Sequence, residues 1–149
     1  MALDRLWKLQ VISLPYRVAL DSNFLLLPLN LRLDIFIEIE RLLQGKVQFI
    51  VIKPVRNELE RLSQRGSELG RRASFALKLM ERCLEIDVKL NRSEKVDEAL
   101  IRFAQDNKVI VATSDMVLKK RLRDINVPVI YVRDLSRLEI EGFPIRDGY

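Results

Sequence analysis

The sequence predicts an α/β fold in which a central parallel sheet of about five strands carries helices on both faces. Apolar runs of strand length alternate with amphipathic segments of helix length along the chain. The 149 residues suit one domain, and no Gly/Ser-rich linker or internal repeat divides them. The run Val109–Ala112 is apolar throughout, which is typical of a central strand buried on both sides.

Short apolar runs bounded by polar or turn residues predict the strands. They occur at Arg17–Leu20, Val47–Ile52, Leu84–Val88, Val109–Ala112 and Val129–Val132. We expect residues 17–149 to form a single domain. The extension at residues 1–16 fits both a strand and a helix.

Helical spacing of apolar residues predicts helices between these strands, with Phe24–Leu29 as a turn or helical stub. The first full helix covers residues 33–43 and ends at Gly45. Pro54 suits the first turn of the second helix. Gly66 and Gly70 separate it from a third helix, and Ser93 is expected to cap a fourth, which runs to Ala104. A fifth covers residues 116–123.

The composition excludes several kinds of chemistry. The chain has no histidine and one cysteine, Cys83, which rules out Ser-His-Asp and Cys-His catalysis, His-ligated zinc and an intrachain disulfide. The net charge of +5 is compatible with a polyanionic partner. The apolar run Phe24–Leu29 is far too short to span a bilayer and the first residues lack an export signal, so we expect a cytoplasmic protein without membrane contact.

Four acidic residues are expected at the edge of the sheet where the parallel strands end. Asp21 follows the first strand, and Asp115 follows the central strand. Glu58 and Asp97 lie early in helices that begin near the same edge. Ligands of open α/β sheets bind at this edge, so the four carboxylates are expected to converge on one crevice.

Converging carboxylates repel one another, and burying them without a partner is costly. A hard divalent cation such as Mg²⁺ relieves that repulsion, because it prefers oxygen ligands and commonly rests on one or two carboxylates. A cation in that position activates water and stabilises the charge of a phosphodiester as its bond breaks.

Taken singly, each acid also has a purely structural explanation. Asp21 suits a turn or helix cap, and Asp115 suits the N-cap of the following helix. Glu58 suits a solvated ion pair with Arg61, and Asp97 suits a favourable charge at a helix N-terminus. Spacing alone leaves both explanations open.

Four segments in order resemble the motifs of PIN-domain nucleases. They are Val18–Phe24, Pro54–Leu59, Val96–Ile101 and Val109–Asp115, the last followed by Leu118 and Lys119; Val127–Arg133 resembles the family's next strand. The resemblance covers about residues 17–142 and is strongest to archaeal PIN proteins similar to rRNA-processing nucleases and to VapC-type toxins. Ser114 is a mild departure, because the family often has Asn there.

The resemblance implies a three-layer α/β/α sandwich and a Mg²⁺- or Mn²⁺-dependent endoribonuclease in a toxin or RNA-processing role. The acidic quartet would be Asp21, Glu58, Asp97 and Asp115. Of these, Asp21, Asp97 and Asp115 would hold the metal directly or through water, and Glu58 would complete the metal shell or orient the attacking water. The hydroxyls of Ser22 and Thr113 would orient the carboxylates or the metal water. The partners implied are RNA, an antitoxin or a ribosome-assembly factor, and a second copy of the chain.

An acidic crevice repels phosphate, so RNA would need a basic rim. The candidates are Arg56, Arg61, Lys119, Lys120 and Arg121. One alternative is a catalytically silent PIN-like module that binds RNA or protein. A phosphotransfer domain is disfavoured because Asp21-Ser22-Asn23 lacks the Asp-x-Asp of such phosphatases, and Arg133 stands where a receiver domain needs Lys. A purely structural α/β protein is a third alternative.

Overall fold

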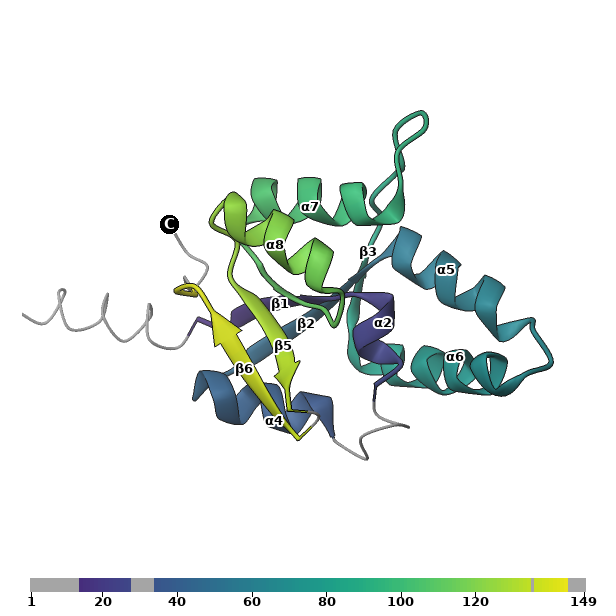
Figure 1. The fold of residues 1–149 in the computed structure, drawn as a ribbon, viewed down its shortest axis with the longest axis horizontal. Helices are drawn as coiled ribbons and strands as arrows, with labels where there is room; N and C mark the ends of the chain where they lie inside the picture. The colour runs from purple at the N-terminus through teal and green to yellow at the C-terminus, as the bar shows by residue number, and fades with distance from the viewer. Residues whose placement is uncertain (1–13, 28–33, 135, 145–149) are drawn as a thin grey trace, which may run out of the picture.

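A six-stranded sheet forms the centre of the molecule (Figure 1). The computed structural model describes residues 14–27, 34–134 and 136–144. The strands are β1 (Tyr16–Leu20), β2 (Val47–Ile52), β3 (Leu84–Ile86), β4 (Ile110–Ala112), β5 (Val129–Arg133) and β6 (Arg137–Glu141). Their order across the sheet is β3-β2-β1-β4-β5-β6.

The central position of β4 is as predicted, and all three of its residues are buried. It pairs with β1 in parallel, with Leu20 opposite Ala112. Just beyond this pair, the Asp21 backbone N–H donates to the Ala112 carbonyl at 3.0 Å. The ends of β1 and β4 therefore lie side by side, which brings the residues that follow them together.

The helices are α2 (Ser22–Leu25), α4 (Ile35–Leu43), α5 (Lys53–Ser63), α6 (Glu68–Leu79), α7 (Val96–Asn107) and α8 (Met116–Asp124), with a 3₁₀ turn at Met80–Arg82. Figure 1 shows α7 and α8 on one side of the sheet and α4 on the other. This confirms the predicted layering of helices about a mostly parallel sheet. No helix in the described ranges is long and apolar enough to cross a membrane.

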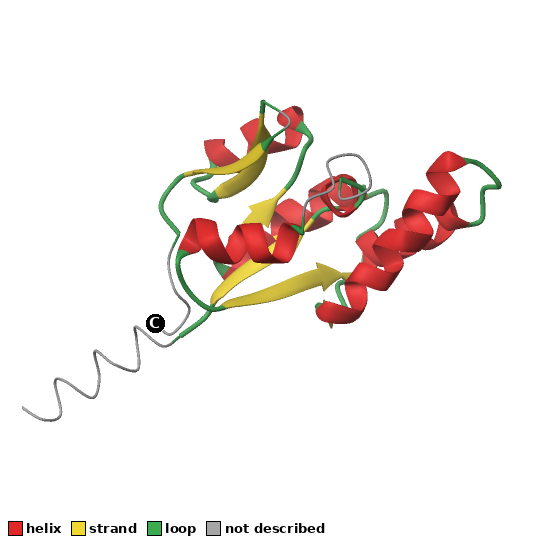
Figure 2. Cartoon of the chain, turned by 90° about the horizontal axis from the view of Figure 1, so that it is seen from below, coloured by secondary structure: helices red, strands yellow, loops and turns green. Residues whose placement is uncertain are grey.

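Helices α5 and α6 form a helical hairpin that extends away from the sheet (Figure 2). Pro54 lies in the first turn of α5, as predicted. Gly70 does not separate the two helices as expected, because it lies buried within α6. A Cβ atom there would lie only 1.8 Å from the Arg65 carbonyl oxygen, so glycine permits the close return of the chain after α5.

The start of α7 differs from the prediction. The helix begins at Val96 with Lys95 as its N-cap, and Ser93 instead adopts a left-handed φ of 63° in the preceding turn. The reason is the neighbouring Glu94, whose carboxylate accepts from the Asn91 backbone N–H at 2.9 Å and from the Arg102 guanidinium at 2.8 and 3.0 Å. These contacts close a turn where the sequence suggested a helix cap.

The sheet also has one strand more than expected. Strand β6 is antiparallel to β5 and lies at the sheet edge, with Leu138 buried and opposite Val132. The third and fourth strands are shorter than predicted, at Leu84–Ile86 and Ile110–Ala112. Most of the predicted N-terminal extension, residues 1–13, and the ends of two predicted segments, residues 28–29 and 33, lie outside the described residues.

Candidate active site

Asp21 is the buried centre of the candidate site. It follows β1 directly, and its residue is only 2% exposed. Its carboxylate accepts from the Ser22 backbone N–H at 2.8 Å and from the Thr113 hydroxyl at 2.8 Å. Burial nevertheless raises the pKa of Asp21 to about 6, and the negative charges of Asp97 and Glu58 add to the rise against those two hydrogen bonds.

Thr113 connects Asp21 to the loop that follows β4. Its buried hydroxyl donates to Asp21 and accepts from the Asp115 backbone N–H at 3.1 Å. One oxygen of Asp115 in turn accepts from the backbone N–H groups of Val117 and Leu118 at 2.9 and 3.2 Å. Asp115 is therefore the N-cap of α8, which is its structural explanation, and it still lies beside the other acids.

Glu58 reaches the site from α5. The Ser22 hydroxyl donates a hydrogen bond to its Oε1 atom. Ser22 itself is 8% exposed and lies in the first turn of α2, directly after Asp21. This contact joins the hairpin of α5 and α6 to the sheet-anchored part of the site and fixes the direction of the Glu58 carboxylate.

Asp97 completes the group from the first turn of α7. Burial raises its pKa, and the negative charges of Asp115 and Glu58 raise it further. The positive charges of Arg121 and Lys95 act in the opposite direction. The four acids thus come from four separate parts of the sequence and act electrostatically on one another at one edge of the sheet.

The side chains approach one another without forming a tight chelate. Within the described ranges, no three carboxylate or thiol side chains come close enough to hold one metal ion together. The donor set nevertheless fits Mg²⁺ or Mn²⁺, because it offers only oxygen atoms and Mg²⁺ keeps several waters while resting on one or two carboxylates. Of the four acids, Asp21 is the most buried, and both its burial and the neighbouring negative charges disfavour its ionised form. A cation bound beside it would favour that ionised form.

Two of the five basic residues predicted to bind nucleic acid already have acidic partners. Arg56 contacts the carboxylates of Glu60 at 3.0 Å and Glu85 at 2.8 Å. Lys119 is paired with Glu141 at 2.8 Å, and its Nζ atom lies 3.7 Å from the centroid of the Tyr131 ring. RNA phosphates would therefore compete with carboxylates for these two cations.

The other three candidates are better placed. Arg61 and Lys120 are exposed and pair with no carboxylate in the part of the chain that the structure describes. Arg121 is also exposed, and its charge acts on Asp97 across the site. These three cations remain predictions for contacts with nucleic acid.

A family model described as "PIN like domain" matches residues 18–135, which include all four acids. The chain belongs to the PIN-like domain family. The curated protein ribonuclease VapC4 of Methanocaldococcus jannaschii is 34% identical over 131 residues, which cover 85% of this chain and 98% of that protein.

Two further proteins are similar to this PIN-like domain. The rRNA-processing protein utp23 of Schizosaccharomyces pombe is 30% identical over 124 residues, which cover 80% of this chain but only 46% of utp23. The solved structure of the PIN domain endonuclease Utp24 has a TM-score of 0.74 at 26% identity, and the match covers 90% of this chain and 97% of that one.

Asn23 is a residue of the site that the sequence patterns did not single out. Its side-chain oxygen accepts from the Ser114 backbone N–H at 3.0 Å and lies 3.3 Å from the Thr113 hydroxyl. It therefore fixes the loop that leads to Asp115. The signal was present in the sequence, since an amide side chain two residues after a strand-ending Asp can bond to backbone groups of a neighbouring loop.

We predict that Ser22→Ala lowers kcat of the PIN-like domain on RNA by about 10-fold or more with little change in KM, since losing a group that only orients a catalytic ligand typically has an effect of that size. The alanine leaves the Glu58 carboxylate without its hydroxyl donor. Steady-state kinetics on a labelled RNA measure the effect. Ser22→Thr restores the hydroxyl and the rate, and Ser74→Ala, on the exposed surface of α6, is the matched control. An unchanged kcat for Ser22→Ala would show that this contact has no positioning role.

Proposed function

We propose that this protein is a divalent-metal-dependent endoribonuclease that hydrolyses RNA phosphodiester bonds with Mg²⁺ or Mn²⁺. The observation that supports this most is the gathering of four mutually acting carboxylates around buried Asp21. Such an arrangement is unfavourable for a protein that only needs stability, and it is useful to one that binds a cation. Similarity to ribonuclease VapC4 and to the PIN domain endonuclease Utp24 supports the same activity.

In this proposal each residue has a definite part. Asp21, Asp97 and Asp115 hold the metal directly or through water, and Glu58 completes its shell or orients the attacking water. Ser22 and Thr113 hold the carboxylates of Glu58 and Asp21 in place. The metal, when bound, supplies activation of the water and stabilisation of charge on the phosphodiester. Exposed Arg61, Lys120 and Arg121 attract the RNA backbone and offset the repulsion between phosphate and the acids.

The relatives support two biological roles for the proposed activity. Similarity to a VapC ribonuclease supports a toxin role, in which an antitoxin would cover the site. Similarity to utp23 supports a role in rRNA maturation, in which assembly factors would bind instead. A small antitoxin gene beside this one would favour the first role. In either role we expect a homodimer.

The proposal is tested by incubating the purified protein with a labelled RNA that has single-stranded and paired regions. We expect cleavage with Mg²⁺ or Mn²⁺, none with EDTA, and recovery when excess metal is added back. Cleavage that persists in EDTA would overturn the metal mechanism. RNA binding without cleavage at any metal concentration would support the alternative of a catalytically silent module.

A further inference from the structure

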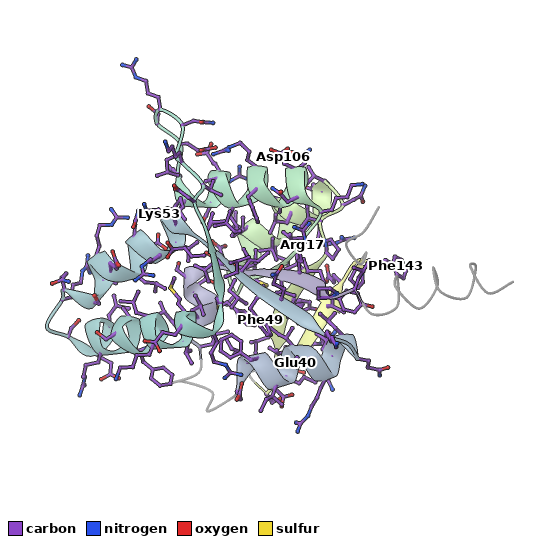
Figure 3. All side chains as sticks on the ribbon, turned by 180° about the vertical axis from the view of Figure 1, so that it is seen from behind. Arg17, Glu40, Phe49, Lys53, Asp106 and Phe143 are labelled. Carbon is purple, nitrogen blue, oxygen red and sulfur yellow. The ribbon has the colours of Figure 1, made fainter. Side chains whose placement is uncertain are left out.

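A groove lies between the start of α5, the segment that follows β3 and the start of α7. Its volume is about 450 Å³, within the range of about 300–1,000 Å³ common for ligand sites. Figure 3 labels Lys53, which lies on its wall at the first residue of α5. The other lining residues are Pro54, Asn57, Arg61, Asp87, Val88, Lys89, Leu90 and Val96.

The walls of this groove combine cations with apolar surface. Lys53, Arg61 and Lys89 contribute three positive charges against the single acid Asp87. None of the three cations pairs with a carboxylate in the described part of the chain. Leu90 is 46% exposed, so its apolar side chain is available for contact. A nucleotide needs both features, a cation for its phosphate and an apolar surface for its base.

The segment that carries Lys89 and Leu90 is held in a fixed shape. Arg102 of α7 donates to the Lys89 carbonyl at 2.8 Å and forms a two-point contact with the Glu94 carboxylate. The side chain of Glu94 is only 11% exposed. These hydrogen bonds hold the segment against α7. Little conformational freedom of its backbone would therefore be lost when a ligand binds.

Two lining residues of the groove directly precede proposed catalytic acids in the sequence. Asn57 precedes Glu58 on α5, and Val96 precedes Asp97 on α7. Arg61 lies on the wall of this groove and also on the wall of a second hollow of about 270 Å³ that contains Glu58. A chain bound in the groove would therefore continue past Arg61 toward Glu58.

We propose that this groove binds one unpaired nucleotide of the RNA substrate, next to the bond that is cut, with Lys53 and Lys89 on the phosphate and Leu90 against the base. This inference rests on the proposed nuclease function. The ligand is single-stranded, because the apolar wall can reach a base face only when that face is free of its stacking neighbour.

The test measures binding in EDTA, so that no cleavage is needed. A short fluorescein-labelled oligouridine is titrated with wild-type protein and with Lys53→Gln, Lys89→Gln and Leu90→Ser, and the anisotropy is followed at several salt concentrations. Each lysine variant is expected to bind several-fold more weakly, and the double variant Lys53→Gln/Lys89→Gln is expected to lower the slope of log affinity against log salt by about 0.7, the value for one phosphate contact on a single strand. Leu90→Ser is expected to weaken binding without changing that slope.

The matched control is Lys46→Gln, an exposed lysine just before β2 at the opposite edge of the sheet, which is expected to bind like wild type. The inference is overturned if the lysine variants also bind like wild type, if the wild type binds no oligouridine at low salt, or if a blunt duplex binds equally well through the same residues. The binding results can be told apart from the activity. If RNA is cleaved in a metal-dependent way but the lysine variants bind oligouridine like wild type, only the proposed role of the groove is rejected. Weakened variants without any cleavage reject only the nuclease proposal.

Discussion

Asp97→Asn is expected to reduce metal-dependent RNA cleavage by more than about 100-fold, because even residues that only orient a metal ligand typically contribute 10–100-fold. The substitution removes one negative charge from a group in which Asp115 and Glu58 already raise the pKa of Asp97. Asparagine keeps the shape of the side chain, so the loss would come from charge and metal affinity. Single-turnover cleavage of a labelled RNA over a range of Mn²⁺ concentrations measures it.

Asp106→Asn is the matched control, since Asp106 is an exposed acid in the last turn of the same helix, α7. We expect it to cleave RNA at the wild-type rate. The metal dependence gives a second readout: weaker metal affinity means that part of the Asp97→Asn rate returns at high Mn²⁺. Cleavage by Asp97→Asn equal to that of the control would mean that Asp97 has no part in the reaction.

Asp21→Asn is expected to abolish cleavage and also to stabilise the metal-free protein. The wild-type carboxylate is buried with a pKa of about 6, well above its ordinary value of 3.8. At 1.36 kcal/mol for each pKa unit, its charge lowers the free energy of unfolding by about 2–4 kcal/mol. Asparagine removes the charge and keeps an oxygen that accepts from the Ser22 backbone N–H. Urea unfolding in EDTA at neutral pH measures the gain.

The pH dependence of this difference follows from the direction of the pKa shift. The folded wild-type protein binds one more proton than the unfolded chain between about pH 4 and pH 6, so its stability falls as the pH rises through that window. The gain in stability of Asp21→Asn over the wild type is therefore largest above pH 6 and disappears near pH 4. The exposed acid Asp124 on α8 provides the control variant, Asp124→Asn, which should show no such trend.

Added Mg²⁺ is expected to reverse the order of stability, because a ligand that binds only the folded protein stabilises it. The melting temperature of the wild type should rise with Mg²⁺, and that of Asp21→Asn should rise much less. An Asp21→Asn protein less stable than wild type in EDTA would show that the buried carboxylate is structurally required. In that case the Asp21 carboxylate would stabilise the metal-free protein instead of destabilising it.

The sequence predicted the convergence of the acids better than it predicted their surroundings. Parallel strands end at one edge whatever their loops do, so Asp21, which directly follows a strand, and Asp115, three residues beyond another, could be placed together by pattern alone. The ion pair of Lys119 could not be predicted, because its partner Glu141 belongs to β6, the strand that the sequence did not indicate. That strand is five residues long, three of them charged, and it depends on pairing with β5.

Local signals failed where a distant residue determined the outcome. Ser93 followed by Glu94 is a normal start for a helix, yet Arg102, eight residues later, draws the Glu94 carboxylate into a different turn. Gly70 resembles a helix breaker in sequence, but the close approach of the Arg65 carbonyl makes it a packing residue. In both cases the deciding contact involves a side chain or carbonyl outside the local motif.

The hairpin of α5 and α6 carries one of the four acids of the proposed site, and the other three lie outside it. Asp21, Thr113 and Asp115 lie at the ends of β1 and β4 and are joined by hydrogen bonds, whereas Glu58 lies on α5 and accepts from the Ser22 hydroxyl. Moving Glu58 away would remove a negative charge that now raises the pKa of both Asp21 and Asp97. The protonation state of the two aspartates therefore depends on how α5 packs, through Val55 and Leu59, on the rest of the molecule.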